Sequence, residues 1–312
     1  MRDASHLHSS VVGGPSSYLE EHQAVSTSRQ GLVAARGLAP EEVAEIRGLA
    51  EMCNALEGLD LTLNLAPEPP PGETNQFLCY HDGVLAGYCS MYPGRNTEMS
   101  GMVHPDYRRR GIGRELFAAA RDEVIRRGAR ALLICETGSA SGQAFVSALG
   151  LPRDMAEHRM ELRSFPVPPP ADERFRLRRA EPEDVDTLAR VSAEAFGDPL
   201  DRTRERVTQL MAALNQRFYL GLFEQEPVGA LRVEDYDGRT FIYGFGVLPQ
   251  HRGQGLGRRI LTRTLEILRA EGRTAVGIEV ETDNVPALAL YHSCGFEIVR
   301  TYEYFKVETP SG

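Results

Sequence analysis

The sequence lacks a surplus of positive charge. Its 35 Lys and Arg residues are outnumbered by 44 Asp and Glu residues, which gives a formal net charge of −9. Because the phosphates of nucleic acids bind to basic surfaces, this balance argues against a nucleic-acid partner. An acidic surface attracts cationic molecules such as amines over long range, although the need for solubility also explains the charge.

Paired cysteines and long apolar runs are missing as well. The chain has five cysteines, an odd number, and contains no Cys-x-x-Cys motif. We therefore expect reduced thiols, and neither a disulfide framework nor a zinc site. The N-terminal residues lack the apolar segment of a signal peptide, and no apolar run is long enough to cross a membrane. These absences predict a cytoplasmic protein that binds no metal and no membrane.

Length and proline content divide the chain. A chain of 312 residues is longer than one typical domain and suits two. Residues 1–30 mix Ser, His, Gly and Gln without periodicity, so we expect a mostly disordered tail. Residues 164–173, SFPVPPPADE, contain four prolines, which favour a stiff, extended linker. The predicted domains are therefore residues 31–163 and 174–312.

The two predicted domains repeat one order of elements. Each opens with a short strand and then a helix start marked by proline and acidic residues, in GLVAARGLAPEEVAEIRGLA and FRLRRAEPEDVDTLARVSAEAF. A hairpin follows in each domain, with predicted turns at Asp82-Gly83 and near Glu226-Pro227. A further strand, NTEMSGMV or TFIYGFGV, then precedes a glycine-rich loop.

The repeat keeps an almost constant spacing. Gly111 and Gly255 are 144 residues apart in the glycine-rich loops, and Gly150 and Gly295 are 145 residues apart. Two loops that were similar by chance would not stay in register over roughly forty residues, so this spacing indicates a duplicated fold.

Each glycine-rich loop, RRRGIG at 108–113 and RGQGLG at 252–257, lies between a strand and a helix. The first turn of a helix has unpaired N–H groups and the positive end of the helix dipole, and glycine lets a phosphate approach them. Both loops therefore look like pyrophosphate cradles flanked by arginines. A lone Gly-x-Gly before a helix is often only a tight turn. The loops match neither a P-loop nor a Rossmann fingerprint.

Apolar stripes predict the two helices that follow these loops. The stripes consist of Leu116, Phe117, Ala120 and Val124 in the first domain, and Ile260, Leu261, Leu265 and Leu268 in the second.

In this context the loops resemble those of the GCN5-related N-acetyltransferase family, whose R/Q-x-x-G-x-G/A loop holds the pyrophosphate of acetyl-CoA. The resemblance also rests on the pattern N…LY…GF in DNVPALALYHSCGF. It covers residues 174–312 well and residues 31–163 more loosely. It implies an α/β (α+β) architecture of two tandem folds, each a mixed, mostly antiparallel, splayed sheet flanked by helices. It also implies direct acetyl transfer from acetyl-CoA to a primary amine within a ternary complex.

The resemblance implies which residues bind acetyl-CoA. In the second domain these are Arg252, Gly253, Gln254, Gly255, Leu256 and Gly257, with backbone contacts at Phe245 and Val247 and an arm contact from Asn284. In the first domain a second candidate loop consists of Arg108, Arg109, Arg110, Gly111, Ile112 and Gly113. Asn284 is also expected to cap the helix that follows it.

Acetyl transfer requires an amine that loses a proton and a thiolate that gains one. Similarity to the ribosomal-protein N-terminal alanine acetyltransferases implies that Glu279 is the base and Tyr291 the acid. The thioester would lie between strands Phe241–Val247 and Ala275–Glu281. Two other interpretations stay open: Glu279 on the solvated face of a strand, and Tyr291 as a core aromatic.

Three further side chains also have two interpretations. Cys294 ends an apolar helix, where a cysteine is more often a small core residue than a nucleophile. Tyr302 and Tyr304 share one face of a predicted strand, where they either line the acceptor pocket or pack the sheet.

The first domain departs from this pattern. At an offset of 145, Ile134, Ser139 and Val146 stand where the second domain has its base, arm contact and acid. We therefore expect catalysis in the second domain. The first domain keeps a loop that can still bind a CoA. Its expected role is to dock on the second as an intramolecular pseudo-dimer that shapes the acceptor site, in a protein that is a monomer or a weak dimer.

The acceptor amine stays open at this point. A peptide N-terminus or a small amine, such as an aminoglycoside or polyamine, suits the chemistry. The tandem organisation also resembles mycothiol synthase, which acetylates an aminosugar thiol precursor and is known for a carboxylate on the strand before its glycine loop; TFIYGFGV has none. A non-catalytic acetyl-CoA sensor is a further alternative, favoured by the altered first domain and opposed by Glu279 and Tyr291.

Overall fold

The computed structural model describes residues 29–60, 69–93, 96–236 and 238–308. Residues 1–28 of the expected disordered tail lie outside the described residues. Arg29 already contacts the first half of the chain, because its Nη1 donates a hydrogen bond to the Tyr80 hydroxyl over 2.8 Å.

The two halves have the same succession of strands and helices, except that η2, α4 and α5 of the second half stand where the described residues of the first half form α1. The first half contains β1 (Gly31–Ala35), α1 (Pro40–Glu57), β2 (Gln76–His81), β3 (Val84–Tyr92), β4 (Thr97–Val103), η1 (Pro105–Tyr107), α2 (Ile112–Arg126), β5 (Ala131–Glu136), α3 (Ala140–Leu149) and β6 (Arg153–Leu162). The second contains β7 (Phe175–Arg179), η2 (Pro182–Asp184), α4 (Val185–Phe196), α5 (Leu200–Met211), β8 (Gln216–Phe223), β9 (Glu226–Tyr236), β10 (Arg239–Val247), η3 (Pro249–His251), α6 (Leu256–Ala270), β11 (Val276–Glu281), α7 (Val285–Ser293) and β12 (Phe296–Val307).

One predicted hairpin turn is confirmed and the other is misplaced. Asp82 and Gly83, both at positive φ, join β2 to β3 as predicted. In the second half the turn is formed by Glu224 and Gln225, at φ of +49° and +72°, and Glu226 already begins β9. Proline is fixed near φ −65°, so Pro227 cannot supply the positive φ that a two-residue hairpin turn needs.

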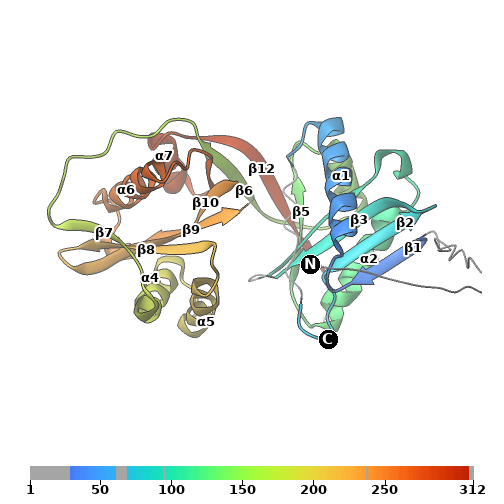
Figure 1. The fold of residues 1–312 in the computed structure, drawn as a ribbon, viewed down its shortest axis with the longest axis horizontal. Coiled ribbons are helices and arrows are strands. Elements are labelled where there is room, and N and C mark those ends of the chain that lie inside the picture. Colours follow the sequence, from blue (N-terminus) through green and yellow to red (C-terminus); the bar gives the residue numbers. More distant parts are fainter. Residues whose placement is uncertain (1–28, 61–68, 94–95, 237, 309–312) are drawn as a thin grey trace, which may run out of the picture.

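All twelve strands form one mixed sheet, in the order β1-β2-β3-β4-β5-β12-β6-β11-β10-β9-β8-β7. The last strand of each half is exchanged. β6 of the first half pairs with β11 of the second, and β12 of the second half pairs with β5 of the first. Figure 1 shows β6 and β12 running together between the two lobes. The linker at 164–173 divides the chain, but the hydrogen bonding of the sheet crosses it.

The exchange follows an approximate two-fold axis. Within the β6–β12 ladder, Glu157 is paired with Tyr302, which is its own counterpart at the repeat offset of 145 residues. A residue that faces its own equivalent lies next to a two-fold axis, as in a symmetric dimer. The two halves are therefore arranged as a pseudo-dimer whose central strand pair is β6 and β12.

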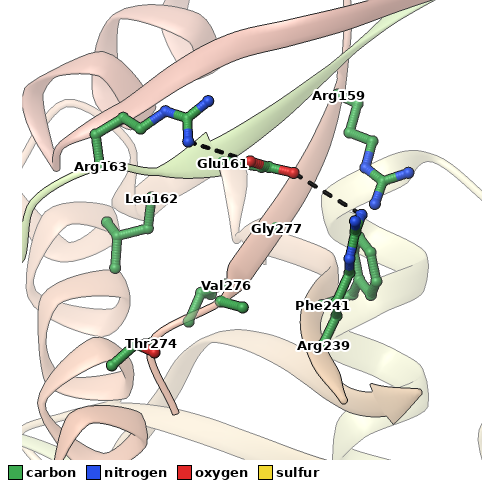
Figure 2. A pocket seen from close by; sticks show the side chains of 10 residues that line it. Arg159, Glu161, Leu162, Arg163, Arg239, Phe241, Thr274, Val276 and Gly277 are labelled. Carbon is green, nitrogen blue, oxygen red and sulfur yellow. Dashed lines mark ion pairs between the residues drawn. The ribbon is translucent and has the colours of Figure 1, made fainter. Parts of the chain in front are cut away.

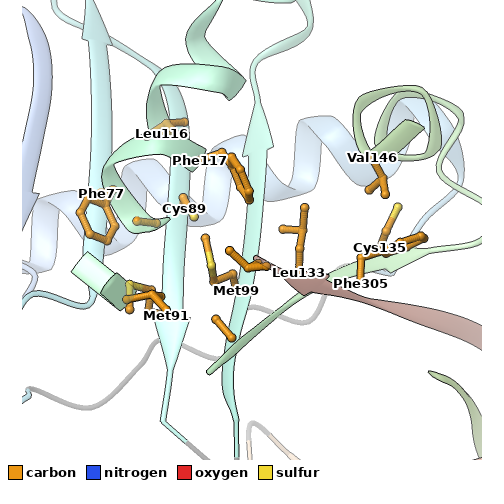
Figure 3. Packing of buried hydrophobic residues seen from close by; sticks show 14 of the residues in the cluster. Phe77, Cys89, Met91, Met99, Leu116, Phe117, Leu133, Cys135, Val146 and Phe305 are labelled. Carbon is orange, nitrogen blue, oxygen red and sulfur yellow. The ribbon is translucent and has the colours of Figure 1, made fainter. Parts of the chain in front are cut away.

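The hydrophobic clusters beneath α2 and α6 each contain residues from both halves. The helices predicted from the apolar stripes bury those stripes: the stripe residues of α2 and α6 are less than 9% exposed. Phe305 and Val307 of β12 lie in the core beneath α2, where Figure 3 shows Phe305 beside Cys135 and Val146. Met160 and Leu162 of β6 lie in the core beneath α6. Burial of such side chains contributes roughly 1.5–3 kcal/mol each.

The sequence predicts reduced cysteines and no segment that crosses a membrane. All five cysteines are free thiols, and all are buried. In the part of the chain that the structure describes, no helix combines the length and the apolar character that crossing a membrane would require.

Candidate active site

The loop between β10 and α6 presents backbone N–H groups at the start of a helix. Gly253 and Gly255 adopt left-handed φ values of +74° and +76°, and Gly255 is the N-cap of α6. A Cβ built on Gly255 would meet no atom within 4 Å, so this residue borders open space in front of the helix. An anion can therefore reach the N–H groups of the first turn, which fits the pyrophosphate of acetyl-CoA.

The corresponding loop of the first half keeps this backbone conformation. Gly111 caps α2 at φ +91°, and Arg109 stands at the position of Gly253 with φ +63°. A non-glycine residue held in this region is strained by roughly 1–3 kcal/mol. The surrounding structure therefore imposes the conformation on both copies.

The first arginine of each motif holds its loop in place. Arg252 donates from Nε to the Val247 carbonyl over 3.0 Å and from Nη2 to the Ala195 carbonyl over 2.7 Å. Arg108 makes the equivalent Nε bond to the Val103 carbonyl over 3.1 Å. Both guanidinium groups tie the loop to the end of the preceding strand, which is a positioning role that sequence reasoning did not distinguish from phosphate contact.

An opening in the sheet lies beside the second loop. β10 and β11 are paired only from Thr240–Val276 to Ile242–Ile278. β10 then bulges between Tyr243 and Gly246, with Gly244 at φ +55°. In the first half, β4 stays in unbroken register with β3 from Val103 to Glu98. The equivalent strands β4 and β5 are paired just as briefly, from Thr97–Ala131 to Met99–Leu133, so the bulge in β10 is what distinguishes the second half at the place where the resemblance puts the thioester.

Glu279 lies at this opening. It is partly buried, while its neighbours Ile278 and Val280 face the core on the other side of the sheet. Desolvation and the nearby charges of Glu157 and Glu98 raise the pKa of Glu279 to about 7, against the opposing effect of Arg159. A carboxyl group that titrates near neutral pH is suited to accept a proton from an ammonium group.

The first half contributes carboxylates to the same surface. Glu98 of β4 and Glu157 of β6 join Glu279 of β11 and Tyr304 of β12 in what we call the carboxylate cluster. The Tyr304 hydroxyl donates to Glu157 Oε2 over 2.7 Å. Desolvation and the charge of Glu157 raise the pKa of Glu98 to about 7, and burial also raises the pKa of Glu157. A cationic amine would be attracted to this cluster, because a positive charge there relieves the repulsion among the carboxylates.

The sequence analysis missed Glu98 and Glu157. The signal that was available is the alternation in RDMAEHRMEL, which puts Glu157, Arg159 and Glu161 on one face of a strand. Nothing in that alternation shows that the strand pairs with β11 of the other half, where Arg159 lies opposite Glu279.

The predicted acid lies in the core on the other side of the opening. Tyr291 is 5% exposed, and its ring stacks on Phe245 with 6.2 Å between ring centroids. This contact puts Tyr291 against the bulged part of β10. Burial raises the pKa of Tyr291 above its ordinary value, so its hydroxyl stays protonated at neutral pH. The two interpretations of Tyr291 are compatible, since it is a core aromatic next to the predicted thioester position.

The other predicted residues of the second half lie as follows. Asn284 caps α7, as predicted, because its side chain accepts a hydrogen bond from Ala287 N over 3.3 Å. Cys294 is fully buried, and desolvation raises the pKa of its thiol, which disfavours a nucleophilic thiolate. Tyr302 donates its hydroxyl to the Asp60 carbonyl over 3.4 Å, so it bridges the two halves.

The first half contains a cavity of about 570 Å³, bordered by its glycine-rich loop. Ile134, Ser139 and Val146 line it, so no carboxylate or tyrosine stands at the positions of the predicted base and acid. Glu57 closes one side by accepting hydrogen bonds from Arg108, over 2.5 Å, and from Ser139 and Ser141. Desolvation opposes ionisation of Glu57, but these bonds outweigh it and bring its pKa to about 2. The cavity is therefore a cleft bordered by the glycine-rich loop, and the carboxylate at its edge stays ionised at neutral pH.

Known proteins share this organisation. The model of the acetyltransferase (GNAT) family matches residues 52–150 and again residues 185–296. The mycothiol acetyltransferase of Thermomonospora curvata is 30% identical over 281 residues, which cover 86% of this chain and 94% of that protein. The mycothiol acetyltransferase of Salinispora arenicola is 32% identical, covering 83% and 91% respectively.

Solved structures show the same fold at lower identity. A GCN5-related N-acetyltransferase from Sphaerobacter thermophilus has a TM-score of 0.74 and 19% identity, covering 89% of this chain and 95% of that chain. A tandem GNAT protein from the clavulanic acid biosynthesis pathway has a TM-score of 0.67 and 20% identity, covering 90% and 99%. With one family match in each half, over most of the sequence, the chain belongs to the GNAT acetyltransferase family as a tandem member.

Proposed function

We propose that this acetyltransferase transfers the acetyl group of acetyl-CoA to the primary amine of an aminosugar thiol. The observation that carries the proposal is the similarity to mycothiol acetyltransferases, which extends through both halves and over 94% of one relative. The sequence analysis placed this acceptor second, behind a peptide or other small amine. Family membership speaks against the alternative of a non-catalytic sensor.

The resemblance to mycothiol synthase implies a carboxylate on the strand before the glycine loop, which in this chain is β10. β10 carries Phe241 and Tyr243 on the face that points to the carboxylate cluster, and no carboxylate. Glu279 lies on the same face of the adjacent strand, at the opening between the two. We therefore assign the proton-accepting role to β11.

The proposed reaction uses three features of the second half. The N–H groups at the start of α6 would bind the pyrophosphate of acetyl-CoA. Glu279 would take a proton from the ammonium group, and the free amine would attack the thioester carbonyl. As the C–S bond breaks, Tyr291 would donate its proton to the departing CoA thiolate, and the attacking nitrogen would give up its second proton, which restores the Tyr291 hydroxyl and leaves the amide. A base and an acid in these positions contribute roughly 10²–10⁴-fold each.

The first half would bind a CoA and help to form the acceptor site. Its loop conformation and its cavity suit a CoA, while Ile134 and Val146 can neither accept nor donate a proton. Its exchanged strand supplies Glu157 and Arg159 to the surface around Glu279. We therefore propose that it completes the acceptor site of the second half.

The test is acetyl transfer to a panel of acceptors. The panel contains an aminosugar thiol, a peptide with an N-terminal alanine, an aminoglycoside and a polyamine. Because the first acceptor has its own thiol, the acetylated products are measured by mass spectrometry and not by thiol release. We expect kcat/KM to be highest for the aminosugar thiol by about 100-fold or more, the scale on which a built polar site discriminates acceptors. A higher kcat/KM for the peptide would contradict this proposal and support a peptide N-terminal amine as the acceptor.

A further inference from the structure

We propose that a second cavity, above Gly277, binds the polyhydroxylated ring of the acceptor while the acceptor amine lies at Glu279. The proposal rests on the proposed function and adds to it a place for the sugar. The cavity has a volume of about 280 Å³, and its walls include Arg159, Glu161, Arg163, Arg239 and Phe241. This volume lies just below the range for ligand pockets, roughly 300–1,000 Å³, and suits a single ring better than a CoA.

The cavity lies on the same face of the sheet as the predicted base. Gly277 is paired with Glu161, and Glu279 is paired with Arg159. Positions two residues apart in a strand point to the same side and are about 7 Å apart. A sugar ring in the cavity above Gly277 is therefore about one ring's length from an amine at Glu279, and Arg159, which lies opposite Glu279, also lines the cavity.

The absence of a side chain at Gly277 makes room for the Phe241 ring, which lines the floor of the cavity. A Cβ built there would lie 2.6 Å from Cε1 of Phe241, which is closer than any real contact. The Phe241 ring therefore lies low against β11. The Arg159 guanidinium stacks over this ring, 4.9 Å from its centre, and Arg159 is only 3% exposed. The wall next to Glu279 is thus rigid.

The polar groups of the cavity suit hydroxyls better than an anion. Figure 2 shows Glu161 between Arg163 and Arg239, with contacts of 3.3 Å and 3.9 Å, and Arg239 also pairs with Asp60 over 3.2 Å. The Arg163 and Arg239 guanidinium groups are therefore each paired with a carboxylate. Guanidinium N–H groups still supply donors, and the carboxylates supply acceptors. A ring with adjacent hydroxyl groups can use both at once, whereas an anion would meet the charge of Glu161.

The test compares two acceptors that share one amino-thiol group, one joined to a hexosamine ring and one ending in an N-methyl amide. Arg239→Gln removes a donor and the contact with Glu161 from the cavity. Arg190→Gln on α4 is the matched control, because both arginine side chains are 45% exposed and both pair with carboxylates. We expect Arg239→Gln to raise KM for the sugar-bearing acceptor about 10–100-fold, the scale of a lost hydrogen bond to a charged group.

The same variant should leave KM for the amide acceptor and for acetyl-CoA within twofold. An equal rise for both acceptors, or no rise for either, would overturn the inference.

A second readout does not depend on turnover. Saturation-transfer NMR with methyl glucosaminide should show contact with the parent and with the Arg190→Gln variant, and a loss of contact in Arg239→Gln. Sugar contact with this pattern but no acetylation of either acceptor would refute the proposed function alone. Absence of sugar contact in the parent would refute the inference.

Discussion

At the scale of single residues, the site depends on carboxyl groups held away from water. The pKa of Glu279 is raised to about 7 by desolvation and by two further carboxylates, one on β4 and one on β6. At pH 8 this group is ionised in the folded and the unfolded chain, and the folded chain bears the cost of the buried charge. At pH 4 it is protonated in the folded chain and largely protonated in the unfolded chain, so the cost disappears.

The first prediction follows from this pH dependence: the ionised Glu279 carboxylate lowers the stability of the folded chain at high pH. Replacement of Glu279 by Gln keeps the shape and removes the charge. We expect the variant to be more stable than the parent at pH 8, by about 3 kcal/mol for a pKa raised from 4.5 to about 7, with the difference shrinking as the pH falls from 7 to 4. Urea unfolding at several pH values measures this. A variant that is less stable than the parent at pH 8 would show that the carboxylate makes favourable contacts instead.

The same substitution should impair catalysis. We expect kcat/KM of Glu279→Gln to fall about 10²–10⁴-fold at pH 8 and to lose the rise with pH that the parent shows near pH 7. Glu281→Gln is the matched control, since Glu281 lies on the same face of β11 and is exposed. Equal losses in the two variants would point to a general electrostatic effect of the strand and not to a base.

Tyr291 carries the third prediction. Tyr291→Phe keeps the ring that stacks on Phe245 and removes only the hydroxyl. We expect kcat to fall about 10²–10⁴-fold with little change in the Kd of acetyl-CoA. Cys294→Ala is the control for the neighbouring buried thiol and should retain most of the activity. If Cys294→Ala abolishes transfer while Tyr291→Phe does not, the thiol takes part in the reaction.

At the scale of elements, the two strand–loop–helix units share a backbone and differ in chemistry. The fourth prediction uses Gly255→Asp and Gly111→Asp, each of which puts a carboxylate at the start of a helix, α6 or α2. Both glycines have positive φ and open space around them, so the backbone strain is matched. We expect Gly255→Asp to abolish transfer and Gly111→Asp to keep most of kcat, measured after circular dichroism has shown both to be folded. The reverse result would move catalysis to the first half.

Elements and their faces could be predicted because their signals are local. Periodicity indicated the buried stripes of α2 and α6, and the cap at Asn284 was predicted; the structure adds that Ser139, its equivalent at the repeat offset, also caps its helix. The turn after β8 was misplaced because proline suggested a turn that Glu224 and Gln225 form. The partners of Glu279 could not be predicted. Glu98 and Glu157 are far away in sequence, and the exchange of β6 and β12 joins their strands to β11 in one sheet.

At the scale of the whole molecule, the exchange of strands makes the two halves one cooperative unit. Phe305 belongs to the second half in sequence and to the core under α2 in space. As the fifth prediction, we expect one thermal unfolding transition for the entire chain, and Phe305→Ala should lower its midpoint without splitting it, at a cost of about 3–5 kcal/mol. Scanning calorimetry tests this. Two transitions, of which only one shifts, would show that the halves unfold independently.

The position of β12 near the end of the chain also bears on how the protein is made. The first half leaves the ribosome with β5 and β6 complete, but the strand that belongs between them is translated about 145 residues later. At roughly 5–20 residues per second, this delay is about 7–30 s. Throughout that time β5 is an unpaired sheet edge next to an incomplete core, the kind of edge that attracts other chains. The nascent first half therefore depends on shielding, by chaperones or by its own helices, until the last strand arrives.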